Sequence, residues 1–176
     1  MPAGLMDSFC CCEDSPGLES LGEVVDSHVH FSGEGGLKSS FHDARYFGEG
    51  ASRCAAYSEE EFEVQTVKCG LDVSQCVFVE CMLGEPLEEA AWAVGRCQTC
   101  DSKIGAVVAH VPAPAGAEAV EAFITQLPGA SATTTPRGLA GGRVVLLGDP
   151  MPHKFSCLDP LYGEGLAALH ARGLHW

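Results

Sequence analysis

Residues 24–31 read VVDSHVHF, and the interpretation of the whole chain starts from this stretch. Its β-branched and apolar residues predict a strand that ends near His30. Alternation along a strand sends residues i and i+2 to the same side, so His28 and His30 are expected to point together. Two imidazoles on one face can bind one divalent ion, each nitrogen at about 2.1 Å. The stretch therefore predicts a metal-binding strand end, against the alternative of a chance pair of histidines at an exposed end.

Beyond this strand, apolar runs alternate with helical stretches. The helices have recognisable ends, such as a capping box of Ser58 and Glu61 and the N-cap and proline pair Asp159-Pro160. Strands are predicted over 24–30, 76–81, 104–111 and 143–147, and helices from Ser58 to Cys69, over 87–97, over 116–127, and from Asp159 to Gly173.

Repeated β-α units are compatible with two architectures, an open doubly wound sheet and a (β/α)8 barrel. Residues 32–36, SGEGG, lack the glycine spacing of a dinucleotide-binding loop and open no predicted helix. Together with the predicted metal-binding end of the first strand, this favours the barrel, and we predict an α/β fold, a partial (β/α)8 TIM barrel of about four βα units. Residues 1–22 are predicted to form a flexible acidic leader, and residues 23–176 a truncated barrel domain.

Composition excludes several classes of partner. The net charge is -14, with 24 acidic and 10 basic residues among 176. Phosphate binding depends on Lys and Arg, so nucleic acid and anionic membranes are not expected partners. No run approaches the roughly 18 apolar residues of a membrane span. Ten cysteines without a secretory signal predict free thiols in a reducing compartment, the cytoplasm.

The order of segments resembles a known family. Residues 24–31 resemble the opening strand of the amidohydrolase superfamily, and more narrowly of the amidohydrolase-related branch that contains lactonases, pyrone-dicarboxylate hydrolases and related decarboxylases. Later segments resemble its second strand and helix at 77–80 and 88–92, its third strand at 104–110, its "GxR" fourth strand at 142–147, and the helix and turn leading to strand five at 164–169 and 172–176.

The resemblance implies a metal-dependent hydrolase that acts on a small lactone or related carboxylated substrate through metal-activated water. His28 and His30 would bind the divalent ion, for which zinc is the expectation. The family's barrel continues into strands with further metal-binding histidines and a catalytic Asp on strand eight. No residue of this sequence can be assigned those roles, so the catalytic residue is left unassigned.

Three further residues are candidates for substrate binding. Glu80 and His110 follow the second and third strands, so they should lie at the same rim as the histidine pair. Glu80 is interpreted as a metal or substrate ligand or as a plain rim carboxylate, and His110 as a substrate ligand or a loop-stabilising side chain. Arg143 could hold a substrate carboxylate or enolate with its planar fork, or form a salt bridge with Glu80.

Two other functions stay open. A catalytically inactive half-barrel could serve as an oligomerisation or regulatory module, because uncovered sheet edges favour a homo-oligomer that completes the barrel. An open flavodoxin-like binding domain is the third interpretation, and it predicts His28 and His30 away from any pocket.

Overall fold

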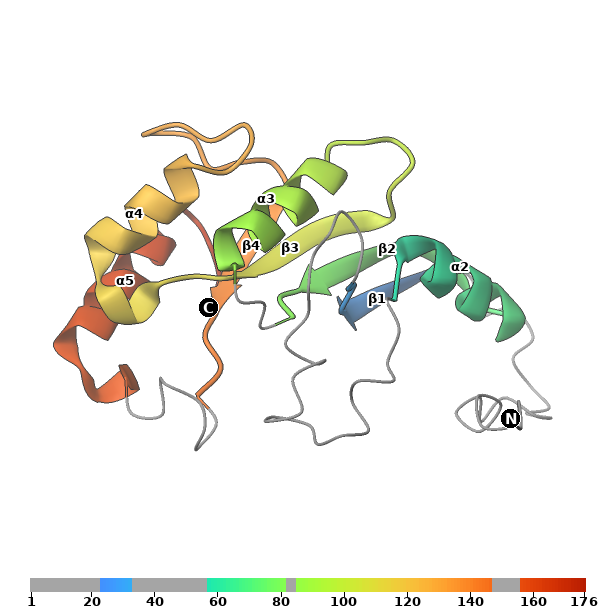
Figure 1. Cartoon of the computed structure of the whole chain (residues 1–176), viewed down its shortest axis with the longest axis horizontal. Coiled ribbons are helices and arrows are strands. Elements are labelled where there is room, and N and C mark those ends of the chain that lie inside the picture. The colour runs from blue at the N-terminus through green and yellow to red at the C-terminus, as the bar shows by residue number, and fades with distance from the viewer. Residues whose placement is uncertain (1–22, 33–56, 82–84, 147–155) are drawn as a thin grey trace, which may run out of the picture.

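The four predicted strands form one parallel sheet with helices between them. The computed structural model describes residues 23–32, 57–81, 85–146 and 156–176, and the predicted leader over residues 1–22 lies outside them. Figure 1 shows the strands side by side, with α3 and α4 along one side of the sheet. The elements are β1 Glu23–Val29, α2 Glu59–Lys68, β2 Asp72–Val79, α3 Pro86–Arg96, β3 Ile104–His110, the short helix η4 Ala113–Ala115, α4 Ala117–Thr125, β4 Leu139–Arg143, the short helix η5 Ser156–Leu158, and α5 Pro160–Ala171.

Strand order separates the two architectures that the sequence left open. The order is β1-β2-β3-β4, and each neighbouring pair is parallel. A doubly wound sheet reverses its strand order at a switch point, whereas a barrel adds each strand beside the previous one. Beyond β4, His175 forms a parallel bridge with Gly141, with His175 N–H donating to Ala140 O and Gly142 N–H donating to His175 O. The prediction of an α/β fold with part of a β/α barrel is confirmed, and the flavodoxin-like alternative is wrong.

The hydrophobic core lies between the sheet and its helices. Alternate residues of β3 and the position after it, Val107, Ala109 and Val111, are buried against the helices. An aromatic group ties the first two strands to α2: the Phe31 ring stacks on Phe78 at 6.1 Å between centroids and meets Phe62 edge-on at 5.7 Å. Burying large aromatic surfaces here fixes the end of β1, which carries the two histidines.

Local capping signals predicted the helix starts correctly. In α2 the Ser58 hydroxyl accepts a hydrogen bond from Glu61 N–H at 3.1 Å, and the Glu61 carboxylate accepts one from Ser58 N–H at 2.9 Å. In α5 the Asp159 carboxylate accepts from Leu161 N–H at 2.9 Å. Both arrangements satisfy backbone donors that a helix start otherwise leaves without partners.

β1 and β3 agree with the prediction to within one residue at each end, whereas β2 and β4 begin four residues earlier than predicted. β2 begins at Asp72 instead of Cys76, because its polar first residues still pair with β1. β4 spans Leu139–Arg143, whereas the sequence predicted 143–147; residue 147 lies outside the described part. Two glycines explain this shift. A Cβ on Gly141 would lie 2.7 Å from His175 O, and one on Gly142 would lie 2.5 Å from a Val111 methyl. Close packing thus selects a strand of low β propensity.

In the described residues no helix is long and apolar enough to cross a membrane. Among the cysteines of that part of the chain, Cys76, Cys97, Cys100 and Cys157 are free thiols.

Candidate functional site

A β-bulge near the end of β1 decides which way the histidines point. Asp26 pairs with Cys76 and Val29 pairs with Phe78, so β1 has one more residue than β2 between these two pairs. The Asp26 carboxylate accepts a hydrogen bond from His28 N–H at 2.9 Å and holds the chain in this irregular form. Val29 is in the core. Because of the extra residue, His28 and His30 face away from that core.

The two imidazoles meet tip to tip. The Nε2 atoms of His28 and His30 are 3.1 Å apart, and the ring centroids are 4.8 Å apart. The Nδ1 of His30 is 2.8 Å from the carbonyl oxygen of Val79. A carbonyl only accepts, so Nδ1 of His30 carries the proton and its Nε2 keeps a lone pair, to which His28 Nε2–H donates when both rings are neutral. The expectation that the two side chains share one side is met.

The pair has the geometry of two ligands of one metal ion. Two nitrogens that each lie about 2.1 Å from a tetrahedral zinc ion are about 3.4 Å apart, close to the observed distance. A ligating histidine commonly donates its other ring N–H to a backbone carbonyl, as His30 does to Val79. Burial lowers the pKa of His30, against the opposing effect of its bond to Val79. His30 is therefore neutral near pH 7, the form that binds metal.

A second polar group lies beside the pair at the same rim. The Glu80 carboxylate is fully buried, and its Oε1 forms an ion pair with Arg143 Nε at 3.2 Å. Its Oε2 lies 4.0 Å from Nδ1 of His110, too far for a direct hydrogen bond. Arg143 and Glu80 lie close enough to His30 to act on its pKa in opposite directions. The structure thus brings Glu80, His110 and Arg143 to one place, and the predicted Glu80–Arg143 salt bridge is present.

The shift of β4 corrects the position of Arg143. In the predicted strand over 143–147, Arg143 is the first residue, and it would lie at the opposite edge of the sheet from Glu80. It ends the strand instead, opposite His110 in the parallel register. Equivalent ends of neighbouring parallel strands meet at one rim, and this is why the guanidinium reaches Glu80.

Sequence reasoning missed a buried carboxyl group beneath this rim. Glu89, in the first turn of α3, is 1% exposed, and its Oε1 accepts a hydrogen bond from Cys81 N–H at 2.7 Å. Its Oε2 has no hydrogen-bond partner among the described residues. Burial raises the pKa of Glu89 to about 7, and the charge of Glu80 acts in the same direction. Glu89 anchors the chain just after Glu80. Its place in the helical pattern, beside the buried Ala90, was the available signal.

The rest of a metal site is not found in the described part of the chain. Within residues 23–32, 57–81, 85–146 and 156–176, no three His, Cys, Asp or Glu side chains are grouped to hold an ion. Glu80 is close enough to His30 to act on its pKa, but among these residues it does not complete the coordination of an ion at the histidine pair.

Comparisons with known proteins support the fold. No family model matches the chain, and no curated protein sequence matches it. Among solved structures, the chain is similar to "Amidohydrolase 2 from Bifidobacterium longum subsp. infantis", with a TM-score of 0.57 and 18% sequence identity. The match covers 86% of this chain and 49% of that one, so the chain spans about half the length of that structure. At this identity the likeness shows the fold alone, an α/β arrangement consistent with a partial TIM barrel.

Proposed function

We propose that the chain carries the metal-binding part of a metal-dependent hydrolase of the amidohydrolase-related type. It would act on a small lactone or related carboxylated substrate, with His28 and His30 as ligands of a divalent ion, most naturally zinc. The observation that carries this proposal is the 3.1 Å contact between the two Nε2 atoms at the carboxyl end of β1. In barrel enzymes, the chemistry takes place at this end of the strands.

Each residue at the rim has a role in this proposal. A bound divalent ion would acidify a water molecule and polarise the scissile carbonyl group. Arg143 would hold a substrate carboxylate, because its Nη groups have no partner in the described residues and its side chain is 33% exposed. Glu80 orients that guanidinium through the ion pair. His110 would contact the substrate beside Arg143. Further metal ligands and the general base would come from outside the described residues.

Zinc binding provides the test. The full chain, loaded with zinc and dialysed, is expected to retain about one ion per chain by elemental analysis. His28→Ala and His30→Ala each remove one of the two ligands, so zinc affinity should fall roughly 100-fold, at least as much as the loss of an outer-shell partner costs. His170→Ala is the matched control, because His170 is exposed on α5. If His28→Ala and His30→Ala retain as much zinc as His170→Ala and the wild type, the proposed metal site is wrong.

A second candidate function is an inactive half-barrel that acts as an oligomerisation or regulatory module. Two features favour it: among the described residues β1 pairs with β2 alone, and the match covers about half of the similar structure. The partner would be a second copy that completes the barrel. Light scattering should then give twice the 18.4 kDa mass of the chain or a higher multiple. Bound zinc without hydrolysis of carboxylated lactones would favour this function over the enzyme.

A further inference from the structure

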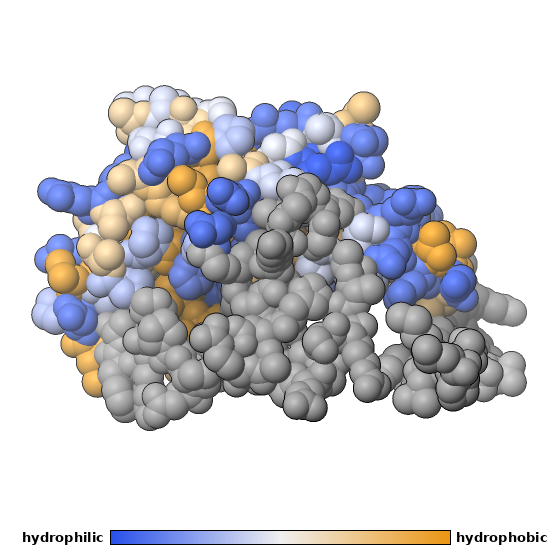
Figure 2. Space-filling model, in the orientation of Figure 1, coloured by the Kyte–Doolittle hydropathy of each residue, from blue (hydrophilic) through white to orange (hydrophobic). Residues whose placement is uncertain are grey.

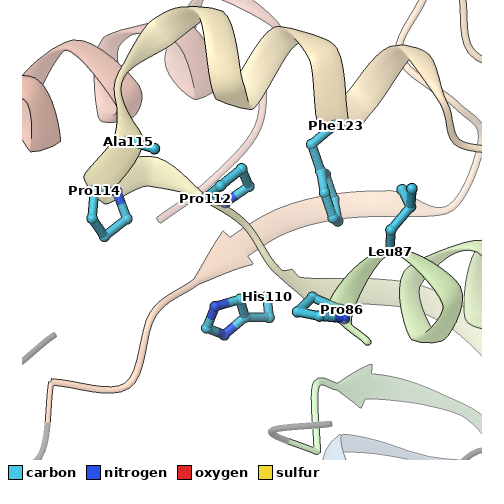
Figure 3. A pocket seen from close by; sticks show the side chains of 7 residues that line it. All are labelled: Pro86, Leu87, His110, Pro112, Pro114, Ala115 and Phe123. Atoms are coloured by element: carbon cyan, nitrogen blue, oxygen red, sulfur yellow. The ribbon is translucent and has the colours of Figure 1, made fainter. Parts of the chain in front are cut away.

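An apolar pocket opens beside the rim, and apart from His110 its lining residues have no role in the proposed chemistry. Its volume is about 290 Å³, near the lower end for small-molecule sites. Figure 3 shows His110 and Pro86 along one side and Pro114, Ala115 and Phe123 across from them. The lining residues come from the first turn of α3, the end of β3, the following turn with η4, and α4: Pro86, Leu87, His110, Pro112, Pro114, Ala115 and Phe123.

The walls of this pocket are rigid. Proline fixes its own φ angle, and three of the lining residues are prolines. Phe123 is 7% exposed and is held in the core between α4 and the sheet. A pocket with fixed walls loses little conformational entropy when a ligand enters. Figure 2 shows apolar surface over this part of the molecule, between α3 and α4.

One polar side chain links the pocket to the rim. His110 lines the pocket, its Nδ1 faces Glu80, and in the parallel register it stands opposite Arg143. Adjacent strands are about 4.8 Å apart, so a ligand seated against His110 has a guanidinium one strand away. The apolar pocket therefore lies next to His110 and to the partly exposed Arg143 guanidinium, which is ion-paired with Glu80 through Nε. This arrangement is complementary to a molecule with a hydrocarbon body and an anionic head.

We propose that this pocket binds the hydrocarbon part, an aromatic ring or a branched alkyl group, of a small carboxylate whose charged end lies at Arg143. The inference rests on the proposed function, because it takes His110 and Arg143 as substrate-binding residues. It requires neither a bound metal ion nor turnover. It narrows the substrate class from small carboxylated molecules in general to those that carry an apolar group of about one ring.

Binding of two simple carboxylates to the full chain provides the test. Phenylacetate and acetate share the charged head and differ in the ring, so calorimetry or ligand-detected NMR should find at least tenfold tighter binding of phenylacetate. Ala115→Trp would fill the pocket from its exposed edge and should weaken phenylacetate binding at least tenfold. Ala122→Trp, at an exposed site of α4 that does not line the pocket, is the matched control and should change nothing.

A second variant keeps the proposal testable if Ala115→Trp fails to fold. Leu87→Ala removes one apolar wall without filling the space, and it should weaken phenylacetate binding several-fold while the melting temperature identifies any unfolded protein. The proposal is overturned if phenylacetate does not bind, if it binds no better than acetate, or if folded Ala115→Trp and Leu87→Ala bind it like the wild type. If the wild-type chain binds phenylacetate but no zinc, the proposed metal site is wrong and the proposed ligand pocket is still supported.

Discussion

Replacing Glu89 with glutamine is expected to raise the free energy of unfolding by about 3 kcal/mol at pH 8 and by less than about 1 kcal/mol at pH 5. The wild-type carboxyl group is 1% exposed, and burial raises its pKa from 4.5 to about 7. Glutamine keeps the oxygen that accepts from Cys81 N–H and removes the charge that burial disfavours.

The direction of the pH dependence follows from the number of protons that the folded and unfolded states bind. Between pH 4.5 and about 7 the folded protein still holds the Glu89 proton, whereas the unfolded chain has released it. The wild-type free energy of unfolding therefore falls as the pH rises through this window and stays low above it. The glutamine variant lacks this dependence, so the two stabilities should diverge from acidic to alkaline pH.

Urea unfolding at pH 5 and pH 8 measures the effect. Glu88→Gln is the matched control, because Glu88 lies in the same helical turn and is exposed. It should shift neither stability by more than about 0.5 kcal/mol. A Glu89→Gln protein less stable than the wild type at pH 8 would show that the folded state needs the ionised carboxylate.

The parts of the fold that local sequence specifies were predictable. The capping box at Ser58 and the Asp159-Pro160 pair gave the starts of α2 and α5, because each cap depends on residues at most three positions apart. The β3 run was also clear, since IGAVVAH is apolar on both faces, as strands covered on both sides are. The alternating units were compatible with a barrel or an open sheet, and only the histidine pair of the first strand favoured the barrel.

Features that depend on distant packing could not be predicted. β4 lies on LAGGR, whose glycines are required by contacts with His175 and Val111 and carry no strand signal of their own. The bulge in β1 could not be predicted either, because its extra residue is recognised only from the pairing of β1 with β2. Even so, His28 and His30 lie on one side, as alternation predicts, although His28 is within the irregular stretch between Asp26 and Val29. Their role as metal ligands stays a prediction.

Gly165→Ala is expected to lower the free energy of unfolding by about 3 kcal/mol, although alanine normally favours a helix over glycine. Gly165 is buried in α5, where a Cβ would lie 2.3 Å from the carbonyl oxygen of Ala113. The obstacle is backbone, so no side-chain rotation can relieve it. Since Ala113 begins η4, which also carries two walls of the pocket, α5 would have to move away from that segment.

Gly163 provides a control of opposite sign on the same helix. It is exposed, and a Cβ there would meet nothing within 4 Å. Gly163→Ala should therefore raise the free energy of unfolding by up to about 1 kcal/mol, through helix propensity alone. Urea unfolding of both variants separates helix propensity from packing. Both carry the same glycine-to-alanine change in α5, and only the atoms that the new Cβ would meet differ. Equal shifts would mean that α5 does not rest on the Ala113 backbone, and the close approach between α5 and η4 would then be wrong.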